Sequence, residues 1–298
     1  MPLIREDILN KQKRSELYAK ALATKKKEQK KRRQQREEER KTLGDAAPPK
    51  PVPTTQEDHR EYDDTVVLKN DDEVYGDEAQ DEFECYYNHS KVPKVMITTR
   101  PRPSRQLFFF LSELQSLIPN SFVYKRGEFH VREICDMAAS KGFTHLIVVN
   151  ETNKKVHSLL LCHLPEGPTA LFKISSFIPH EDISNVGAVT NHQPELILNN
   201  FTTRLGRRVG RMLGSLFPHD PQFEGRRVIT FHNQRDFIFV RQHRYMFESR
   251  EKGRLQELGP RFTLKPRWIQ VGKFNMKGEY EWKFNHKMIE TSRRKWFL

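Results

Sequence analysis

The sequence is poor in the residues that build catalytic, metal-binding or disulfide-stabilised sites. Its 298 residues include three cysteines, Cys85, Cys135 and Cys162, whose spacing fits neither a zinc cluster nor a disulfide framework. We interpret them as buried or incidental thiols in a reducing compartment. The histidines show no HExxH spacing, and there is no GxxxxGK[ST] loop, GxGxxG turn or GxSxG elbow. The sequence therefore predicts no metal and no cofactor, and nothing in it argues for an enzyme.

Long apolar runs are also missing. No run approaches the roughly 18 residues that a membrane-spanning helix needs. The N-terminal stretch MPLIREDILNKQKR lacks the apolar centre of a secretory signal. We therefore expect neither a membrane span nor secretion.

Positive charge is in excess. Lys and Arg total 52 against 39 Asp and Glu, which gives a net charge of +13 and a pI near 9.6. This balance favours a polyanionic partner, with nucleic acid ahead of an acidic membrane surface. The excess is uneven: residues 200–298 hold 22 basic and 9 acidic residues, while residues 54–84 hold 2 basic and 13 acidic ones.

Composition divides the chain into four regions. Residues 1–41, with 15 basic and 7 acidic residues, form a basic tail that is either a nuclear or nucleic-acid-binding arm or a solvated extension with transient helix. Residues 42–91 form a proline-containing acidic linker, which we expect to be disordered. It could shield a basic surface, dock on a basic partner or be inert. Residues 92–273 are the folded domain, and 274–298 are a C-terminal extension.

The folded region reads as an α/β domain with an internal repeat. Strand patterns at 92–99, 145–151, 158–164 and 169–175 alternate with helix patterns at 104–118 and 131–141. A helix from Thr202 to Phe217 and strands at 226–233 and 236–247 follow in similar order. A shared Thr-Thr-Arg tripeptide supports a duplication with its boundary near 165–175. Two further strand-like pieces flank Pro266, whose missing N–H predicts an edge or a bulge.

The segment TTRLGRRVGRMLGSLFP, residues 202–218, is predicted to form a helix with three distinct faces. At 100° per residue, its apolar residues gather on one arc and its four arginines, Arg204, Arg207, Arg208 and Arg211, gather on the opposite one. Gly206, Gly210 and Gly214 form a stripe that would let another backbone or a ligand approach closely. The alternatives for the cationic face are a solvated surface and a phosphate-binding surface.

Three other segments carry basic residues among apolar ones: Arg100, Arg102 and Arg105 in the first half, Arg235, Arg241 and Arg244 in the second, and Arg261, Lys265 and Arg267 beside Phe262 and Trp268. Arginine binds phosphate with two parallel hydrogen bonds, and exposed bases stack on guanidinium or aromatic planes. The alternative is that these are edge-strand charges that prevent aggregation. We interpret Phe108, Phe109, Phe110, Phe237 and Phe239 as core residues.

These segments together resemble the Brix-domain family of ribosome assembly factors. The resemblance lies in KVMITTRPRPS, LNNFTTRLGRRVGRMLGSLFP, VITFHNQRDFIFVRQHRY, ELGPRFTLK, GEYEW and TSRRK, in that order. It implies a fold of two similar α/β halves, each like the anticodon-binding domain of class II tRNA synthetases. It also implies a non-enzymatic nucleolar protein that binds pre-ribosomal RNA of the large (60S) subunit, together with another assembly factor. The family's RNA-binding motif, likened to a sigma-factor segment, corresponds to Gly253–Gln270.

We therefore predict a non-catalytic pre-rRNA-binding assembly factor without a small-molecule substrate or membrane partner. A protein-interaction adaptor whose basic face docks acidic protein segments is the main alternative, and an RNA-processing enzyme ranks last. The candidate RNA-binding residues are Arg100, Arg102, Arg105, Arg204, Arg207, Arg208, Arg211, Arg235, Arg241, Arg244, Gly253, Arg254, Arg261, Phe262, Lys265 and Arg267.

Overall fold

The computed structural model describes residues 10–43, 52–68, 71–250, 252–286, 292 and 294–298. The chain divides into two units, residues 1–55 and 56–298. The first contains helix α1, Lys11–Leu43, built from strong helix formers with almost every described side chain exposed. Its helical state agrees with the partly helical tail that the sequence predicts, and it has no apolar face to pack on a core.

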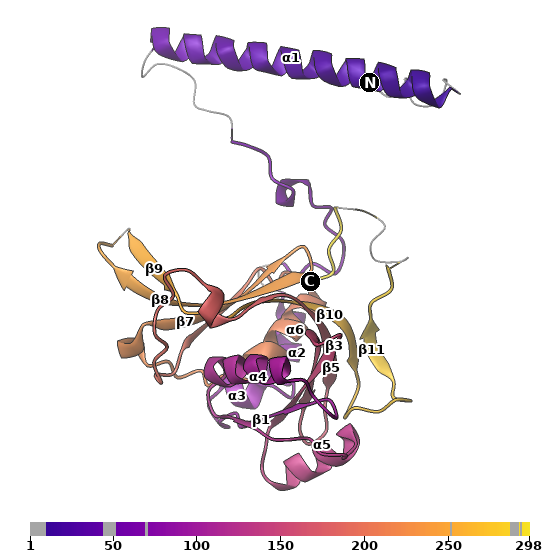
Figure 1. The fold of residues 1–298 in the computed structure, drawn as a ribbon, viewed down its shortest axis with the longest axis vertical. Coiled ribbons are helices and arrows are strands. Elements are labelled where there is room, and N and C mark those ends of the chain that lie inside the picture. Colours follow the sequence, from indigo (N-terminus) through magenta and orange to yellow (C-terminus); the bar gives the residue numbers. More distant parts are fainter. Residues whose placement is uncertain (1–9, 44–51, 69–70, 251, 287–291, 293) are drawn as a thin grey trace. The chain divides into compact units, whose positions relative to one another are not determined.

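The second unit is built on one mixed sheet (Figure 1). Its described strands run in the order β2-β1-β3-β4-β5-β10-β8-β7-β6, with β11 paired to β10 and β9 paired to β8. Their bounds are β1 Val95–Thr99, β2 Ser121–Val123, β3 His145–Thr152, β4 Lys155–His163, β5 Thr169–Ile178, β6 Glu195–Asn199, β7 Arg227–Gln234, β8 Phe237–Phe247, β9 Gly253–Glu257, β10 Arg261–Gln270 and β11 Tyr280–Lys283. The helices are α2 Asp72–Ala79, α3 Glu84–Tyr87, α4 Arg105–Leu117, α5 Val131–Ser140 and α6 Arg204–Gly214, with three short 3₁₀ turns, η2 Glu57–His59, η3 His180–Asp182 and η4 Phe223–Gly225.

The order of elements confirms the internal duplication. In the first half β1 leads through α4 to its parallel neighbour β3, and antiparallel β4 and β5 follow. In the second half β6 leads through α6 to its parallel neighbour β7, and antiparallel β8 and β10 follow. Strands β5 and β10 pair antiparallel and join the halves. The two Thr-Thr-Arg tripeptides are not equivalent, because Thr98 and Thr99 end a strand whereas Thr203 is the N-cap of α6.

The second half is the shorter copy. Between β1 and β3 the first half carries β2 and α5, and α5 packs on the sheet face opposite α4. In the second half, the 3₁₀ turn η4 is the only element between α6 and β7 among the described residues, so the counterparts of β2 and α5 are missing there. Figure 1 shows α5 and the β8–β9 hairpin at opposite ends of this unit. One face of the second-half sheet therefore lacks the helical cover that its counterpart has.

The main core lies between the sheet and helices α4 and α6. Phe110, Phe172, Phe217 and Phe262 are fully or almost fully buried there. The strand at Pro266 is continuous rather than split, with a register shift between Pro266 and Trp268 where the partner of β10 changes from β8 to β11. The predicted bulge is confirmed. The missing N–H of proline is accommodated where the ladder changes partners.

Two expectations about burial and order were wrong. Three of the five phenylalanines predicted to lie in the core are exposed: Phe108, Phe109 and Phe237. Phe108 and Phe109 lie on the outer side of α4 and are exposed, since only one face of that helix meets the sheet. Part of the acidic linker is folded rather than disordered: residues 71–87, here called the acidic segment, carry α2 and α3 and bury Phe83 and Tyr86 completely. Burial of these two rings supplies the apolar contact that the composition alone did not reveal.

Asp236 gives a prediction about pH. It lies in the tight turn between β7 and β8, where its Oδ1 accepts hydrogen bonds from the N–H groups of Phe297 and Leu298 at 2.8 and 2.9 Å. Burial raises the pKa of its carboxyl from 3.8 to about 6. Because the Asp236 carboxyl holds its proton more tightly in the folded than in the unfolded protein, the protonated carboxyl adds to the free energy of unfolding. This contribution is fully present below pH 4 and is lost as the pH rises to 6.

We therefore expect Asp236→Asn to match the wild type near pH 4 and to exceed its unfolding free energy at pH 7 by up to about 3 kcal/mol. The amide keeps the Oδ1 acceptor, and asparagine tolerates the positive φ of 66° at this position. Urea unfolding at pH 4, 5, 6 and 7 measures the effect. A constant difference across this range would contradict it.

Candidate nucleic-acid interface

Helix α6 forms as the sequence predicts. Thr203 caps it, with its Oγ1 accepting a hydrogen bond from the Gly206 N–H at 2.9 Å. Val209, Met212 and Leu213 are buried against the sheet, so the four arginines point away from the main core. The periodicity therefore placed the cationic face correctly.

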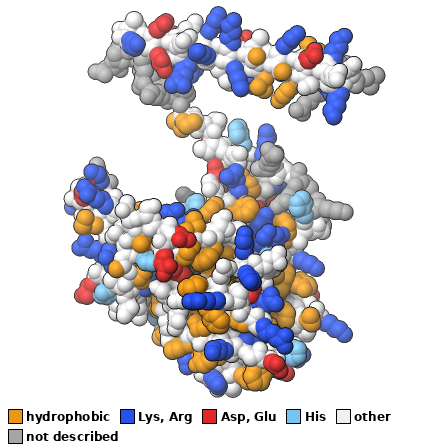
Figure 2. Space-filling model, viewed as in Figure 1, with side chains coloured by type: hydrophobic (Ala, Val, Ile, Leu, Met, Phe, Trp, Pro, Cys, Tyr) orange, Lys and Arg blue, Asp and Glu red, His pale blue; other side chains and the backbone are white. Residues whose placement is uncertain are grey.

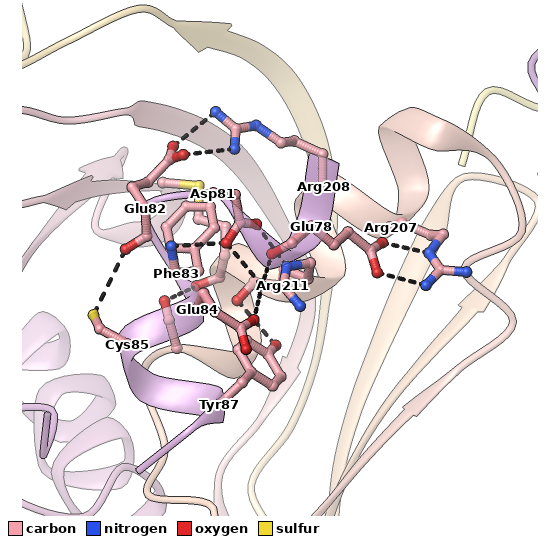
Figure 3. Close-up of polar contacts among 12 residues, drawn as sticks. Glu78, Asp81, Glu82, Phe83, Glu84, Cys85, Tyr87, Arg207, Arg208 and Arg211 are labelled. Carbon is pink, nitrogen blue, oxygen red and sulfur yellow. Dashed lines mark hydrogen bonds and ion pairs between the residues drawn. The ribbon is translucent and has the colours of Figure 1, made fainter. Parts of the chain in front are cut away.

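The arginines of α6 contact the acidic segment, as Figure 3 shows for Arg207, Arg208 and Arg211. Each guanidinium pairs with at least one carboxylate of the same chain. The pairs are Arg204 with Glu73 and Asp71, Arg207 with Glu78, Arg208 with Glu82 and Glu281, and Arg211 with Asp81 and Glu84. Several of these ion pairs are bidentate. The N–O distances are 2.5 and 2.6 Å for Arg207 to Glu78 and 2.6 and 2.7 Å for Arg211 to Asp81. This geometry is the strong form of an arginine–carboxylate pair.

The pairs become more buried along the helix. Arg204 keeps 49% of its side-chain surface exposed and its partner Glu73 keeps 71%, whereas Arg211 and Asp81 keep 14% and 10%. Burial opposes the charge of Arg211, but hydrogen bonds to Asp81 and Glu84 outweigh it and raise its pKa. The Arg211 guanidinium also lies 4.5 Å from the centre of the Tyr87 ring. The C-terminal end of α6 is therefore the most tightly held part of this contact.

Aromatic residues anchor the acidic segment between its charges. Phe83 and Tyr86 are buried in the fold, and the Tyr86 hydroxyl lies 3.0 Å from Nε2 of His163 on β4. The Tyr87 hydroxyl donates to the carbonyl of Arg211 at 3.2 Å, and burial raises the pKa of that phenol. RNA phosphates would reach the inner α6 arginines only if this anchored segment left.

The glycine stripe of α6 also contacts the chain itself. A Cβ at Gly206 would lie 2.7 Å from the backbone of Leu298, one at Gly210 3.3 Å from the Phe201 ring, and one at Gly214 2.1 Å from the Tyr87 hydroxyl. The stripe lets these three groups pack directly against the helix backbone. The close approach predicted from the sequence exists, and its partners are segments of this protein.

The first-half arginines lie around the β1–α4 loop. Arg100 donates to the carbonyl of Glu151 at 3.1 Å, Arg102 adopts a positive φ of 53°, and Arg105 begins α4. All three are exposed. They form a small cationic loop between β1 and α4, and their role in RNA binding remains a prediction.

The second-half candidates divide among several locations. Arg235 lies in the β7–β8 turn, and Arg244 donates to the carbonyl of Ala188 at 3.0 Å on the α4 side of the sheet. Gly253 and Arg254 lie on β9, where Arg254 pairs with Glu248. Arg261 pairs with Glu257. Phe262 is in the main core and has no surface with which to stack on a base.

Three candidates share one face of the sheet, which we call the open sheet face. This is the side of the second-half sheet opposite α4 and α6, to which alternate residues of each strand point. Arg241 of β8 and Lys265 and Arg267 of β10 lie there. The Lys265 ammonium is 4.6 Å from the Phe237 ring and 4.9 Å from the Phe284 ring, and the Arg267 guanidinium is 5.1 Å from Phe284. Figure 2 shows Lys and Arg side chains interspersed with hydrophobic ones on the molecular surface in its view.

Sequence reasoning missed two features of the basic surfaces. The pairing of α6 with the acidic segment joins residues 129 positions apart, as in Arg207 and Glu78, and no local pattern reports it. The aromatic row of the open sheet face did leave a signal, because every second residue of β8 is aromatic or cationic: Phe237, Phe239, Arg241, His243, Tyr245 and Phe247. That alternation indicates a strand with one polar and aromatic face.

The chain belongs to the Brix-domain family, since the Brix domain matches residues 101–268. Within that family it is similar to Ribosome production factor 1 of Xenopus laevis, with 52% identity over 249 residues that cover 83% of this chain and 73% of that protein. A Brix domain-containing protein of Caenorhabditis elegans is 53% identical over 83% of this chain and 65% of its own length. The crystal structure of a probable ribosomal biogenesis protein from Aeropyrum pernix K1 is 14% identical with a TM-score of 0.43, covering 65% of this chain and 99% of that one. Among the described helices, none has the length and apolarity needed to cross a membrane.

Proposed function

We propose that this protein is a non-catalytic ribosome assembly factor that binds precursor rRNA of the large subunit in the nucleolus. The observation that carries the proposal is the identity of about half the residues with proteins named Ribosome production factor 1. The net charge of +13 supports an RNA partner, because basic side chains that neutralise phosphates release condensed counterions. Other assembly factors are the expected protein partners.

The α6 arginines are not the first candidates for contact with RNA. The inner α6 arginines face carboxylates, so RNA contact falls first to cations elsewhere: the β1–α4 loop with Arg102 and Arg105, and the open sheet face with Arg241 and Arg267. Binding here means holding RNA by charge and shape while assembly proceeds. No step of this function requires a nucleophile or a metal.

Salt dependence tests the RNA-binding part. We expect log K for a large-subunit precursor fragment to fall linearly with log salt, with a slope of about −0.7 for each single-stranded phosphate contacted. Fluorescence anisotropy between 50 and 300 mM KCl measures it for the full chain. A flat plot would contradict phosphate binding. Sedimentation of tagged protein with small-subunit rather than large-subunit precursors would contradict the assignment of subunit.

A protein-interaction adaptor is the second candidate function. Its support is that a basic surface of this fold, the α6 arginines, already binds an acidic protein segment within the same chain. An adaptor would retain an acidic peptide partner in the presence of excess RNA. Competition of the two for the full chain distinguishes the candidates.

A further inference from the structure

The open sheet face differs from its counterpart in the first half. There, Met96, Leu146, Val148, Leu160 and Cys162 form an apolar surface under α5, with Cys162 fully buried. On the open sheet face, apart from the buried Val228, the residues on β7 and β8 are threonine, glutamine, histidine, arginine and aromatic residues instead. No described α-helix covers them, and the 3₁₀ turn η2 contacts the face at Gln234, which donates a hydrogen bond to Glu57. The apolar face of a helix such as α5 would leave these polar groups unsatisfied. The face is therefore suited to a polar partner.

Aromatic rings lie in a row along this face. Side chains at alternate positions of a strand are about 7 Å apart, which spaces the β8 row evenly. Phe237 and Phe247 near its two ends are 40% and 72% exposed, and Tyr245 lies 5.3 Å from Phe247 between ring centres. Rings exposed on a sheet are the surface on which unpaired bases stack.

Cations flank the row and indicate an anionic ligand. Lys265 of β10 is in direct register with Lys173 of β5, so two ammonium groups occupy opposing positions on the same face. Arg241 lies 5.9 Å from the Phe239 ring, with its pKa lowered by burial. Positive charge thus borders the aromatic row on its β10 and β5 side.

We propose that the open sheet face binds single-stranded RNA, with bases stacked on the β8 aromatic row and phosphates held by Lys173, Lys265 and Arg267. The proposal rests on the RNA-binding function proposed above and names the class of RNA. Duplex RNA presents its phosphates and its minor-groove hydroxyls, while its bases stay stacked within the helix and cannot reach the rings.

Affinity measurements on the full chain test the base contacts. The probes are a fluorescent single-stranded 12-mer of mixed sequence and a hairpin duplex of the same composition. We expect Phe237→Leu and Phe247→Leu each to weaken binding of the 12-mer by at least about fivefold, the lower end for loss of one stacked base, and to leave the hairpin affinity unchanged. Phe109→Leu, at an exposed ring on α4, is the matched control and should change neither. Urea unfolding confirms that each variant is folded.

Charge variants test the phosphate contacts. Lys173→Gln should reduce the magnitude of the salt slope for the 12-mer by about 0.7, one single-stranded phosphate contact, while Lys141→Gln at the end of α5 should leave it unchanged. Wild type that binds the hairpin as tightly as the 12-mer would overturn the proposal. So would ring variants that bind the 12-mer normally, although RNA binding as such would then stand.

Failure of wild type to bind either probe would instead remove the RNA-binding function itself. If the ring variants then lost a copurifying assembly factor, the open sheet face would be a protein-docking surface and the present proposal would be wrong.

Discussion

Replacing Arg211 by Gln is expected to lower the free energy of unfolding by about 2–4 kcal/mol, because it leaves the largely buried Asp81 and the half-buried Glu84 without their cation. Arg204→Gln on the same helix is the matched control, and we expect no measurable change, since Arg204 and Glu73 are both largely exposed. Urea unfolding of the full chain, with the transition of the folded unit followed by tryptophan fluorescence, measures both.

A double-mutant cycle isolates the pair itself. Asp81→Asn removes the other charge, and the doubly changed protein should lose less than the sum of the two single losses, because neither group is then left charged without a partner. Strict additivity would mean that Arg211 stabilises the fold through packing on Tyr87 alone. Equal losses for Arg211→Gln and Arg204→Gln would contradict the gradient of burial along α6.

Two further variants on α6 test the prediction that its arginines contact RNA. While the acidic segment is in place, the folded Arg207→Gln and Arg208→Gln proteins should bind RNA within about twofold of wild type, because their guanidinium groups already pair with Glu78 and Glu82. A loss that also lowers the salt slope would show that RNA displaces the acidic segment.

Replacing Arg227 by Met is expected to destabilise the fold by about 3 kcal/mol, because its hydrogen bonds to partly buried backbone carbonyls are lost. Arg227 begins β7 and is buried, and burial lowers its pKa to about 10. Its guanidinium donates to the carbonyls of Ser116 and Leu117 in the last turn of α4, and to Thr190 at 3.1 Å. It thereby ties a second-half strand to the C-terminal end of a first-half helix, where a positive charge is favoured.

The control for Arg227 lies directly opposite it in the sheet. Arg244 is the register partner of Arg227 on β8 and makes one exposed hydrogen bond, to Ala188. Arg244→Met should change the unfolding free energy by less than about 0.5 kcal/mol, as surface substitutions usually do. Urea unfolding at pH 7 measures both variants. Similar values for the two would mean that the carbonyls at the end of α4 find other donors.

The sequence by itself determined the local elements and the faces of most of them. Alternation and helical period gave α4, α5, α6 and β7 with bounds within a few residues, because such patterns record which side of one element is buried. The glycine stripe and Pro266 likewise predicted a close approach and a bulge, since backbone geometry is a property of the residue itself.

Only the tertiary structure decided what those faces meet. The α6 arginines looked available because their carboxylate partners lie more than 120 positions earlier, in a segment whose composition resembles a disordered linker. Phe237 looked like a core residue because nothing in β8 reports that the second half lacks a counterpart of α5. Charge and hydrophobicity are local properties of a side chain, whereas its availability depends on which distant segment packs against it.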